Sequence, residues 1–291
     1  MKMIASGLEH RGRKSLGSLA ALLACLTFAP MSSAQDQVVT LAITRPPVAG
    51  TMAPTQSFIV TTPAVVAPAP TAVVILLTGG TGSISLTSAG SNGTLGINSS
   101  NFVVRDRWLF AGHGFYTITL DSATDFQLLP NGLKGQQGST AHITDILQVI
   151  AWARATVPGL PVWVVGTSRG TAGAFVAAAY NPASGGPDGL VFSSPVNDTG
   201  DPDSLLSANL AAITVPVLLV GDAGNACPGT LAADDATVKK MLTSSPKVEN
   251  ETLPSGGLIA LTDACNPLSD HGFFGLEDKA VRKMALFIET Y

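Results

Sequence analysis

The stretch at residues 161–173 constrains the fold of this chain more than any other. It begins with an apolar run rich in β-branched residues, passes through Gly-x-Ser-x-Gly at 166–170, and continues as an Ala-rich helical pattern. This order predicts a strand, a sharp turn at Ser168 and a helix. Gly166 and Gly170 would leave room for the strand and the helix to approach closely. Because Gly-x-Ser-x-Gly also arises by chance in a chain with 30 glycines, it is the flanking pattern that favours a nucleophilic serine.

A turn of this kind would hold the hydroxyl of Ser168 above the edge of the sheet. The backbone N–H of Arg169, at the start of the helix, would point to where negative charge develops on a carbonyl oxygen during acyl transfer. A serine hydroxyl is a weak nucleophile by itself, so a base must come from elsewhere in the chain.

The first 34 residues are predicted to be an export signal rather than part of the fold. Lys and Arg residues cluster in 1–14, an apolar run covers 16–29, and a small-residue site ends at Ala34, where cleavage is expected. The apolar run is too short for a membrane-spanning helix, which needs about 20 residues. A lipoprotein anchor at Cys25 is the alternative, because Leu-Leu-Ala-Cys resembles a lipobox. Otherwise we expect a periplasmic or secreted protein.

Residues 35–291 are long enough for a single α/β domain. They retain two cysteines, Cys227 and Cys265, and an even pair in an oxidising compartment predicts a disulfide. Two separate buried thiols are the alternative. Only 12% of the residues are charged, the net charge is -4, and no Lys/Arg cluster follows the signal, so we expect no nucleic-acid partner. No feature of the sequence indicates an oligomeric state.

Short apolar runs alternate with helical patterns along the rest of the chain. The alternation predicts an α/β fold with a doubly wound, mainly parallel sheet and helices on both faces. Ligands of such sheets bind beyond the carboxyl ends of the strands. The connection at 194–214 is too short for a large lid domain, so we expect an open cleft. The expected strands are 38–43, 57–61, 72–77, 115–121, 161–165, 189–193, 215–221 and, at an edge, 247–253, and the expected helices are 101–112, 140–157, the one after the serine, and 275–290.

The strand at 72–77 ends in Thr-Gly-Gly-Thr, and a loop rich in Gly and Ser follows to about residue 100. The loop could be mistaken for a phosphate cradle, but it lacks the Gly-Lys-Ser/Thr ending. We expect Gly80, or Thr81 beside it, to supply a second backbone N–H to an oxyanion hole. A surface loop without a role is the alternative.

Three histidines beyond the signal are candidates for the base. His113 and His142 precede the serine, whereas His271 lies in a loop after the last strand, from which it could reach over the sheet. His271 also agrees with the order nucleophile, acid, histidine, so it is the predicted base. None of the three has the spacing of metal ligands, and no metal site is expected.

The acid of a Ser-His-acid triad would accept the other ring N–H of the histidine. Asp222 directly follows the strand that ends at Gly221 and is the predicted acid, and Asp198 after the preceding strand is a second candidate. Asp222 could equally bond its own backbone in a turn.

Three motifs together resemble the α/β-hydrolase superfamily: the elbow at 166–170, the strand end Leu-Thr-Gly-Gly at 77–80, and His-Gly-Phe at 271–273. The resemblance covers essentially all of 35–291. It is greatest to compact, lidless, exported members near the dienelactone-hydrolase-like esterases.

The resemblance implies a role for each matching residue. Ser168 would be the nucleophile, His271 the general base and acid, and the backbone N–H groups of Gly80 and Arg169 the oxyanion donors. Many members carry His-Gly where Thr-Gly stands at 78–79 in this chain.

A second departure concerns the acid. The family's acid usually lies three or four residues after the strand-ending glycine, which falls on Gly224 and Asn225 in this chain. Either Asp222 reaches the histidine, or Asn225 orients it as a neutral acceptor, or Asp198 serves. A disulfide between Cys227 and Cys265 would tie the acid loop to the histidine loop.

These expectations describe an exported serine hydrolase that cleaves carboxylic esters through an acyl-enzyme, without a metal or an organic cofactor. A cleft with little charge suits small or medium uncharged acyl groups, including exposed ester bonds of a polymer. Two alternatives stay open. The chain could be a non-catalytic binding protein on the same scaffold, or an acyltransferase that passes the acyl group to another acceptor.

Overall fold

The computed structural model describes residues 35–62, 69–86, 99–256 and 263–291. The predicted export signal with Cys25 lies outside these residues, as does most of the Gly/Ser-rich loop before residue 100. Among the residues described, no helix is long and apolar enough to cross a membrane.

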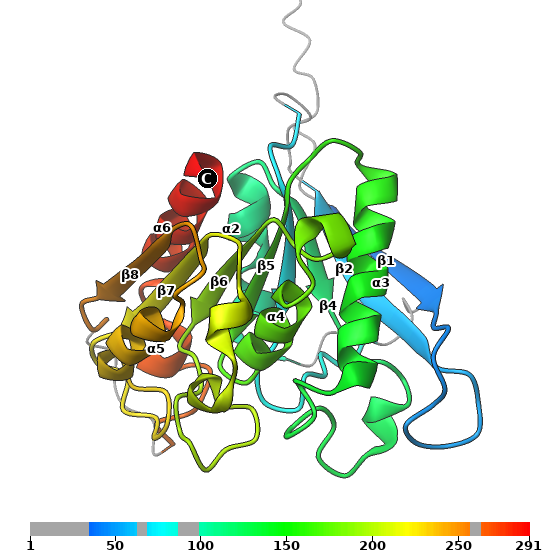
Figure 1. The fold of residues 1–291 in the computed structure, drawn as a ribbon, viewed down its shortest axis with the longest axis horizontal. Coiled ribbons are helices and arrows are strands. Elements are labelled where there is room, and N and C mark those ends of the chain that lie inside the picture. Colours follow the sequence, from blue (N-terminus) through cyan, green and yellow to red (C-terminus); the bar gives the residue numbers. More distant parts are fainter. Residues whose placement is uncertain (1–34, 63–68, 87–98, 257–262) are drawn as a thin grey trace, which may run out of the picture. The chain divides into compact units, whose positions relative to one another are not determined.

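The strands of the described residues form one mixed sheet in the order β1-β2-β4-β3-β5-β6-β7-β8 (Figure 1). β1 and β2 run antiparallel, β2 is antiparallel to β4, and every later pair in this order is parallel. The predicted mainly parallel sheet is therefore confirmed. The strands are β1 (Gln35–Ala42), β2 (Thr55–Thr62), β3 (Val73–Leu77), β4 (Tyr116–Leu120), β5 (Val162–Thr167), β6 (Gly189–Ser193), β7 (Val217–Asp222) and β8 (Val248–Leu253).

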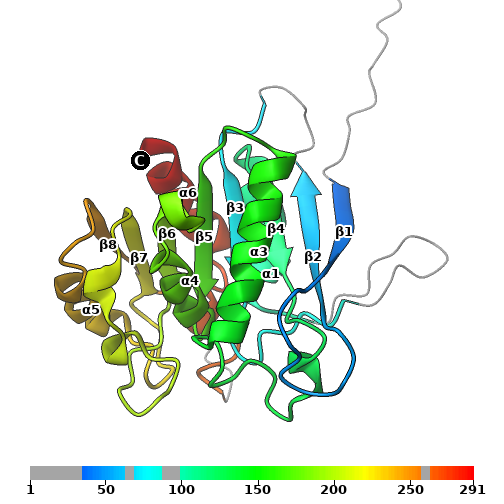
Figure 2. The ribbon, with the colours of Figure 1, turned by 45° about the vertical axis from the view of Figure 1, so that its right-hand side comes forward.

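Helices cover both faces of the sheet (Figures 1 and 2). One face packs against α3 (Thr140–Thr156), α4 (Gly170–Ala178) and α5 (Asp235–Met241), and the other against α1 (Phe102–Arg105), α2 (Arg107–Gly112) and α6 (Glu277–Thr290). Because helices lie on both sides, every residue of β3, β5, β6 and β7 is buried, which explains their continuous apolar runs. Short 3-10 turns lie at Phe126–Leu128, Pro182–Ser184, Leu205–Ser207, Leu210–Ala212, Ala232–Asp234 and Asp270–Gly272.

The structure departs from the predicted elements in two places. The single helix expected at 101–112 is two short helices, because Asp106 has φ -102° and ψ 9° and interrupts the helical geometry between them. The helix α5 was not predicted, since its seven residues form too short a pattern to stand out. The predicted edge strand is confirmed as β8, and the connection at 194–214 contains two 3-10 turns and no lid domain.

A buried ion cluster ties the segment after β1 to α3. The guanidinium of Arg45 donates to Asp125 and to Asp145 of α3, with N–O distances of 2.6 Å in both pairs. The side chains of Arg45, Asp125 and Asp145 are 7%, 2% and 0% exposed. Arg45 also donates to the carbonyl of Ala141 and lies over the ring of Phe126. Removing the arginine would leave two carboxylates buried without a counter-charge.

We expect Arg45→Met to lower the free energy of unfolding by about 3–5 kcal/mol, because it breaks a buried ion pair from one side. The matched control is Arg282→Met, since Arg282 pairs with Asp278 on the surface and both side chains are about two-thirds exposed. That variant should cost less than about 1 kcal/mol. Urea denaturation of both variants measures the difference, and equal effects would contradict the structural role given to Arg45.

Candidate active site

The elbow predicted at Ser168 is present between β5 and α4. Ser168 has φ 53°, the left-handed region that side chains other than glycine rarely adopt. Such a conformation costs about 1–3 kcal/mol and persists only when the surroundings hold it. The N–H of Ser168 donates to the carbonyl of Ser193 in β6 at 2.9 Å, and its own carbonyl accepts from the backbone and the hydroxyl of Thr171.

Two glycines make this elbow possible by allowing backbone contact. A Cβ on Gly166 would lie 2.5 Å from the carbonyl oxygen of Gly170, and a Cβ on Gly170 would lie 2.6 Å from the carbonyl oxygen of Leu77. Real Cβ atoms do not come so close to backbone atoms. The predicted role of both glycines is therefore confirmed, and α4 starts directly against the ends of β3 and β5.

The loop after β3 lies against the serine. A Cβ on Gly79 would be 2.8 Å from the Cβ of Ser168 and 3.3 Å from its Oγ. Gly80 follows with φ 62°. Within the described part of the chain, the N–H groups of Gly80 and Arg169 donate to no other group. Two free donors that line the same cavity as a serine hydroxyl form a suitable arrangement for an oxyanion.

Asp121, at the end of β4, holds this loop in place. Its buried carboxylate accepts from the N–H of Ile84 at 2.7 Å and from that of Leu86 at 3.0 Å. The carbonyl of Thr81 in turn accepts from the N–H of Leu133. Asp121 was not among the residues singled out in the sequence, because only the folded loop brings its partners to it.

The predicted base, His271, lies in the last 3-10 turn before α6 and is 8% exposed. Its carbonyl accepts from the hydroxyl of Ser194 at 3.0 Å, and its Nδ1 lies 3.2 Å from Oγ1 of Thr230. Burial lowers the pKa of His271 to about 4, and the carboxylate of Asp263 opposes this only in part. A neutral imidazole, the form that accepts a proton, therefore dominates at neutral pH.

Arg105 of α1 supports the histidine loop from outside. Its guanidinium donates to the carbonyls of Pro267 at 3.0 Å and Gly272 at 2.6 Å, and it pairs with Glu277 at the start of α6. The backbone on both sides of His271 is thereby attached to the helix that follows β3.

The other two histidines lie elsewhere. His113 ends α2 and stacks on Phe115. His142 is fully buried in α3, where burial lowers its pKa to about 3. Neither borders the cavity that contains Ser168. Among the described residues, no group of three or more His, Cys, Asp or Glu side chains is placed to hold a metal ion.

A cavity of about 610 Å³ brings most of the predicted site residues together, but the predicted acid Asp222 is not among the residues that line it. Ser168, His271, Gly80 and Arg169 all line it. The rest of its wall is mixed: hydroxyls of the loop after β3, the rings and methyl groups of Phe102, Val196 and two prolines, and a few charged groups at Lys134, Asp198 and Asp201. In the described structure no hydrogen bond joins the serine to the ring, a bond that catalytic serines often form only with substrate bound.

The backbone and the side chain of Arg169 have different roles at the cavity. The guanidinium turns away to pair with Asp201 and, at 2.9 Å, with Asp203. Asp203 is 1% exposed and also accepts from the N–H of Gly135 at 2.7 Å. The side chain therefore holds the loops that border the cavity.

The three candidates for the acid are placed differently. One oxygen of Asp222 accepts from the N–H of Gly224 at 2.7 Å and the other has no partner among the described residues. Burial, together with the nearby Asp270, raises the pKa of Asp222 to about 6. Asp198 is exposed, borders the cavity and caps the N–H of Gly200. Neither carboxylate bonds to the histidine.

Asn225, the third candidate, lies beside the base without touching it. Its Nδ2 donates to the carbonyl of Thr230 at 2.7 Å and lies 3.2 Å from Oγ1 of Thr230. Thr230 is thus the residue that contacts the ring of His271. Sequence reasoning missed it, and a lone threonine after Cys-Pro-Gly carries no signal that could have identified it.

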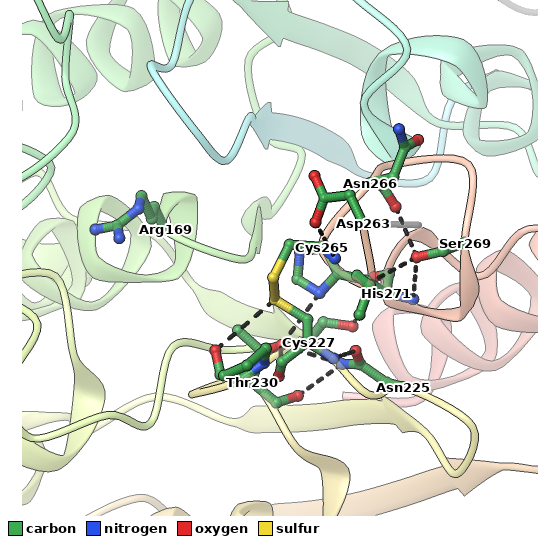
Figure 3. The surroundings of a disulfide bond; sticks show 12 residues. Arg169, Asn225, Cys227, Thr230, Asp263, Cys265, Asn266, Ser269 and His271 are labelled. Atoms are coloured by element: carbon green, nitrogen blue, oxygen red, sulfur yellow. Dashed lines mark hydrogen bonds between the residues drawn. A yellow bond between two sulfur atoms is a disulfide. The ribbon is translucent and has the colours of Figure 1, made fainter. Parts of the chain in front are cut away.

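The predicted disulfide is confirmed and joins the two loops. Cys227 and Cys265 are bonded, at a sequence separation of 38. Figure 3 shows Asn225, Thr230 and His271 grouped around this bond. Both half-cystines line the cavity. The bond therefore holds the loop after β7 against the loop that carries the histidine.

We expect reduction of this disulfide to lower the free energy of unfolding by about 4 kcal/mol, because a closed loop of this length restricts the unfolded chain. Urea denaturation with and without reductant measures the change. The control is the Cys227→Ser, Cys265→Ser double variant, whose midpoint should not respond to reductant. Equal midpoints for the oxidised and reduced wild type would contradict the role given to the bond.

No model of a known protein family matches the sequence, and no curated protein matches it. Solved structures do. A dienelactone hydrolase from Anabaena variabilis aligns with a TM-score of 0.55 at 14% identity, over 86% of this chain and 98% of that one. A zinc-bound, cold-adapted esterase from an Arctic intertidal metagenomic library aligns with a TM-score of 0.53 at 14% identity, over 86% and 95%.

An α/β serine hydrolase without a lid, from Xanthomonas campestris, aligns with a TM-score of 0.51 at 14% identity, over 86% of this chain and 95% of that one. At this identity the likeness concerns the fold. The sheet order, the elbow between β5 and α4 and these three alignments agree. The chain has the α/β-hydrolase fold in its lidless form.

Proposed function

We propose that this protein is a serine hydrolase that cleaves carboxylic esters through an acyl-enzyme. The observation that carries the proposal is the strained Ser168 at the strand-to-helix elbow, in one cavity with a buried, neutral His271 and two unpaired backbone N–H groups. Structural strain of this kind persists where function requires it. The proteins of similar fold, named as hydrolases and esterases, support the same reaction class.

The proposed reaction begins when the Oγ of Ser168 attacks the ester carbonyl carbon and His271 takes the hydroxyl proton. The carbonyl oxygen becomes negative and receives hydrogen bonds from the N–H groups of Gly80 and Arg169. The tetrahedral intermediate then collapses, the bond to the alcohol breaks, and His271 gives the leaving oxygen its proton. Water repeats the sequence on the acyl-enzyme, releases the carboxylic acid and restores Ser168.

We also propose that residues 1–34 direct export and are removed, and that the domain begins at residue 35. The disulfide between Cys227 and Cys265 supports an oxidising compartment, where such bonds form and persist. We propose ester substrates that are small, or that expose their ester bonds on a polymer, because the described residues contain no lid domain and the cavity carries both hydroxyl and apolar groups. The same acyl-enzyme could pass its acyl group to an alcohol, which product analysis in the presence of competing alcohols would detect.

A second candidate function is binding without catalysis. The observation that favours it is the lack of a carboxylate on His271 among the described residues. A scaffold that only binds would not depend on the nucleophilicity of Ser168, so the substitutions below distinguish the two functions.

We expect Ser168→Ala and His271→Ala each to lower kcat/KM for p-nitrophenyl acetate, butyrate and octanoate by at least about 10³-fold, because nucleophile and base act as one unit. The matched controls are Ser100→Ala, which removes another hydroxyl from the same cavity, and His113→Ala, which removes a histidine outside it. Both controls should keep activity within about threefold. Equal hydrolysis by wild type and Ser168→Ala would contradict the proposal.

The pH dependence follows from the burial of His271. The base must be neutral, and the imidazole is neutral above its pKa of about 4. We therefore expect kcat/KM to rise with pH, to be half-maximal near pH 4, and to be level between about pH 6 and 8. Circular dichroism over the same range controls for unfolding. A midpoint at the ordinary histidine pKa of about 6.5 would contradict the buried, neutral base.

A further inference from the structure

The polar partner of the proposed base is a hydroxyl rather than a carboxylate. Nδ1 of His271 lies 3.2 Å from Oγ1 of Thr230, and these residues are 8% and 4% exposed. Among the described residues, no Asp or Glu side chain bonds to this ring. Because water is largely excluded from the contact, Thr230 determines how the ring is held.

The other bonds of the Thr230 hydroxyl determine which atom carries the proton. A threonine hydroxyl has one proton to donate and two lone pairs that accept. Oγ1 donates to the carbonyl of Cys227 at 3.1 Å and accepts from Nδ2 of Asn225 at 3.2 Å. With its proton directed to Cys227, the hydroxyl has one lone pair left for His271. Nδ1 of the ring must then be the donor, and Nε2 carries the free lone pair.

Asn225 keeps the threonine in this role. Its Oδ1 accepts from the N–H of Cys227 at 3.0 Å, which orients the amide so that Nδ2 points to Thr230. Nδ2 also donates to the carbonyl of Thr230 at 2.7 Å. Asn225 is 6% exposed, and the disulfide of Cys227 attaches the whole turn to the loop of His271. The side-chain polar atoms of Asn225 and the hydroxyl of Thr230 thus find their hydrogen-bond partners within this turn and at the ring of His271.

We propose that Thr230, held by Asn225 and the backbone of Cys227, is the positioning residue for His271 and occupies the place that a carboxylate holds in a Ser-His-Asp triad. It keeps the ring in the Nδ1–H tautomer, so that Nε2 faces the cavity of Ser168 as the base. The inference rests on the proposed function. It adds a residue, Thr230, which the proposed function does not by itself require.

A neutral orienting group has a chemical consequence. A carboxylate both orients the ring and stabilises the imidazolium that forms when the serine loses its proton. The Thr230 hydroxyl provides the first effect and little of the second. The base therefore stays neutral to low pH, in keeping with its burial, and transition-state stabilisation depends more on the oxyanion donors. Among the described residues, the charged group that acts on the ring is Asp263, and the charged side chains that line its cavity are Lys134, Arg169, Asp198 and Asp201.

The test compares Thr230→Val, which keeps the shape and removes the hydroxyl, with Thr230→Ser, which restores the hydroxyl. We expect Thr230→Val to lower kcat for p-nitrophenyl butyrate by about 10²-fold with little change in KM, because a misplaced base slows chemistry more than binding. Thr230→Ser should recover most of the loss. Thr144→Val, on the exposed side of α3, controls for the substitution itself.

A second measurement determines the tautomer of the His271 ring without using activity. In ¹⁵N-histidine-labelled protein, assigned with His271→Ala, the nitrogen shifts of His271 should show the Nδ1–H tautomer at pH 7. In Thr230→Val they should move to a mixture of tautomers or to Nε2–H. Unchanged shifts and unchanged kcat in Thr230→Val would overturn the inference. So would an Nε2–H tautomer in wild type, or a loss of kcat in Asp222→Asn as large as in Thr230→Val, since Asp222 would then be the acid.

The two proposals fail in different ways. If wild type and Ser168→Ala are equally inert, the hydrolase assignment fails, and the tautomer of His271 in Thr230→Val still shows whether the hydroxyl positions the ring. If wild type is active and depends on Ser168 while Thr230→Val is as active as wild type, only the role of Thr230 is overturned.

Discussion

The close approach of three backbone segments at Ser168 is the constraint on which the rest of the site depends. The end of β3, the elbow after β5 and the start of α4 come so near to one another that a single methyl group on Gly79, Gly166 or Gly170 would overlap a neighbour. This contact holds Ser168 in a left-handed conformation and places the N–H groups of the loop after β3 beside its hydroxyl. The proposed nucleophile and its proposed oxyanion donors are thus arranged by main-chain geometry, which needs no flexible side chain to hold it.

The proposed base, His271, is positioned by a different set of interactions, most of them between residues far apart in the chain. Arg105 holds the carbonyls on both sides of His271, Ser194 bonds to the histidine's own carbonyl, and the disulfide attaches the loop after β7. Thr230 then contacts the ring itself. The position of Ser168 thus comes from a local motif, and that of His271 from long-range contacts. The cavity between them is the place where both sets of interactions meet.

The difference between a local motif and long-range contacts explains what could be predicted from the sequence. The strand, elbow and helix around Ser168 follow a local pattern, and the fully buried strands appear as continuous apolar runs, so the fold class and the elbow at Ser168 could be predicted. The placement of His271 in the same cavity as Ser168 could be predicted from its position in chain order. The contact of Thr230 with the ring could not, because it depends on hydrogen bonds to Cys227 and Asn225 that exist only in the folded turn. Asp222 is the last residue of β7 and caps the N–H of Gly224, the backbone bonding that short acidic side chains favour in turns.

The central claim is that Ser168 is an activated nucleophile. The most direct test is to incubate the folded protein with a fluorophosphonate, measure its intact mass, and map the adduct by peptide sequencing. We expect a single adduct on Ser168, no adduct in Ser168→Ala, and labelling of His271→Ala that is slower by a factor of about 10² or more. A folded wild-type protein that gains no mass, or an adduct that persists in Ser168→Ala, would contradict the account.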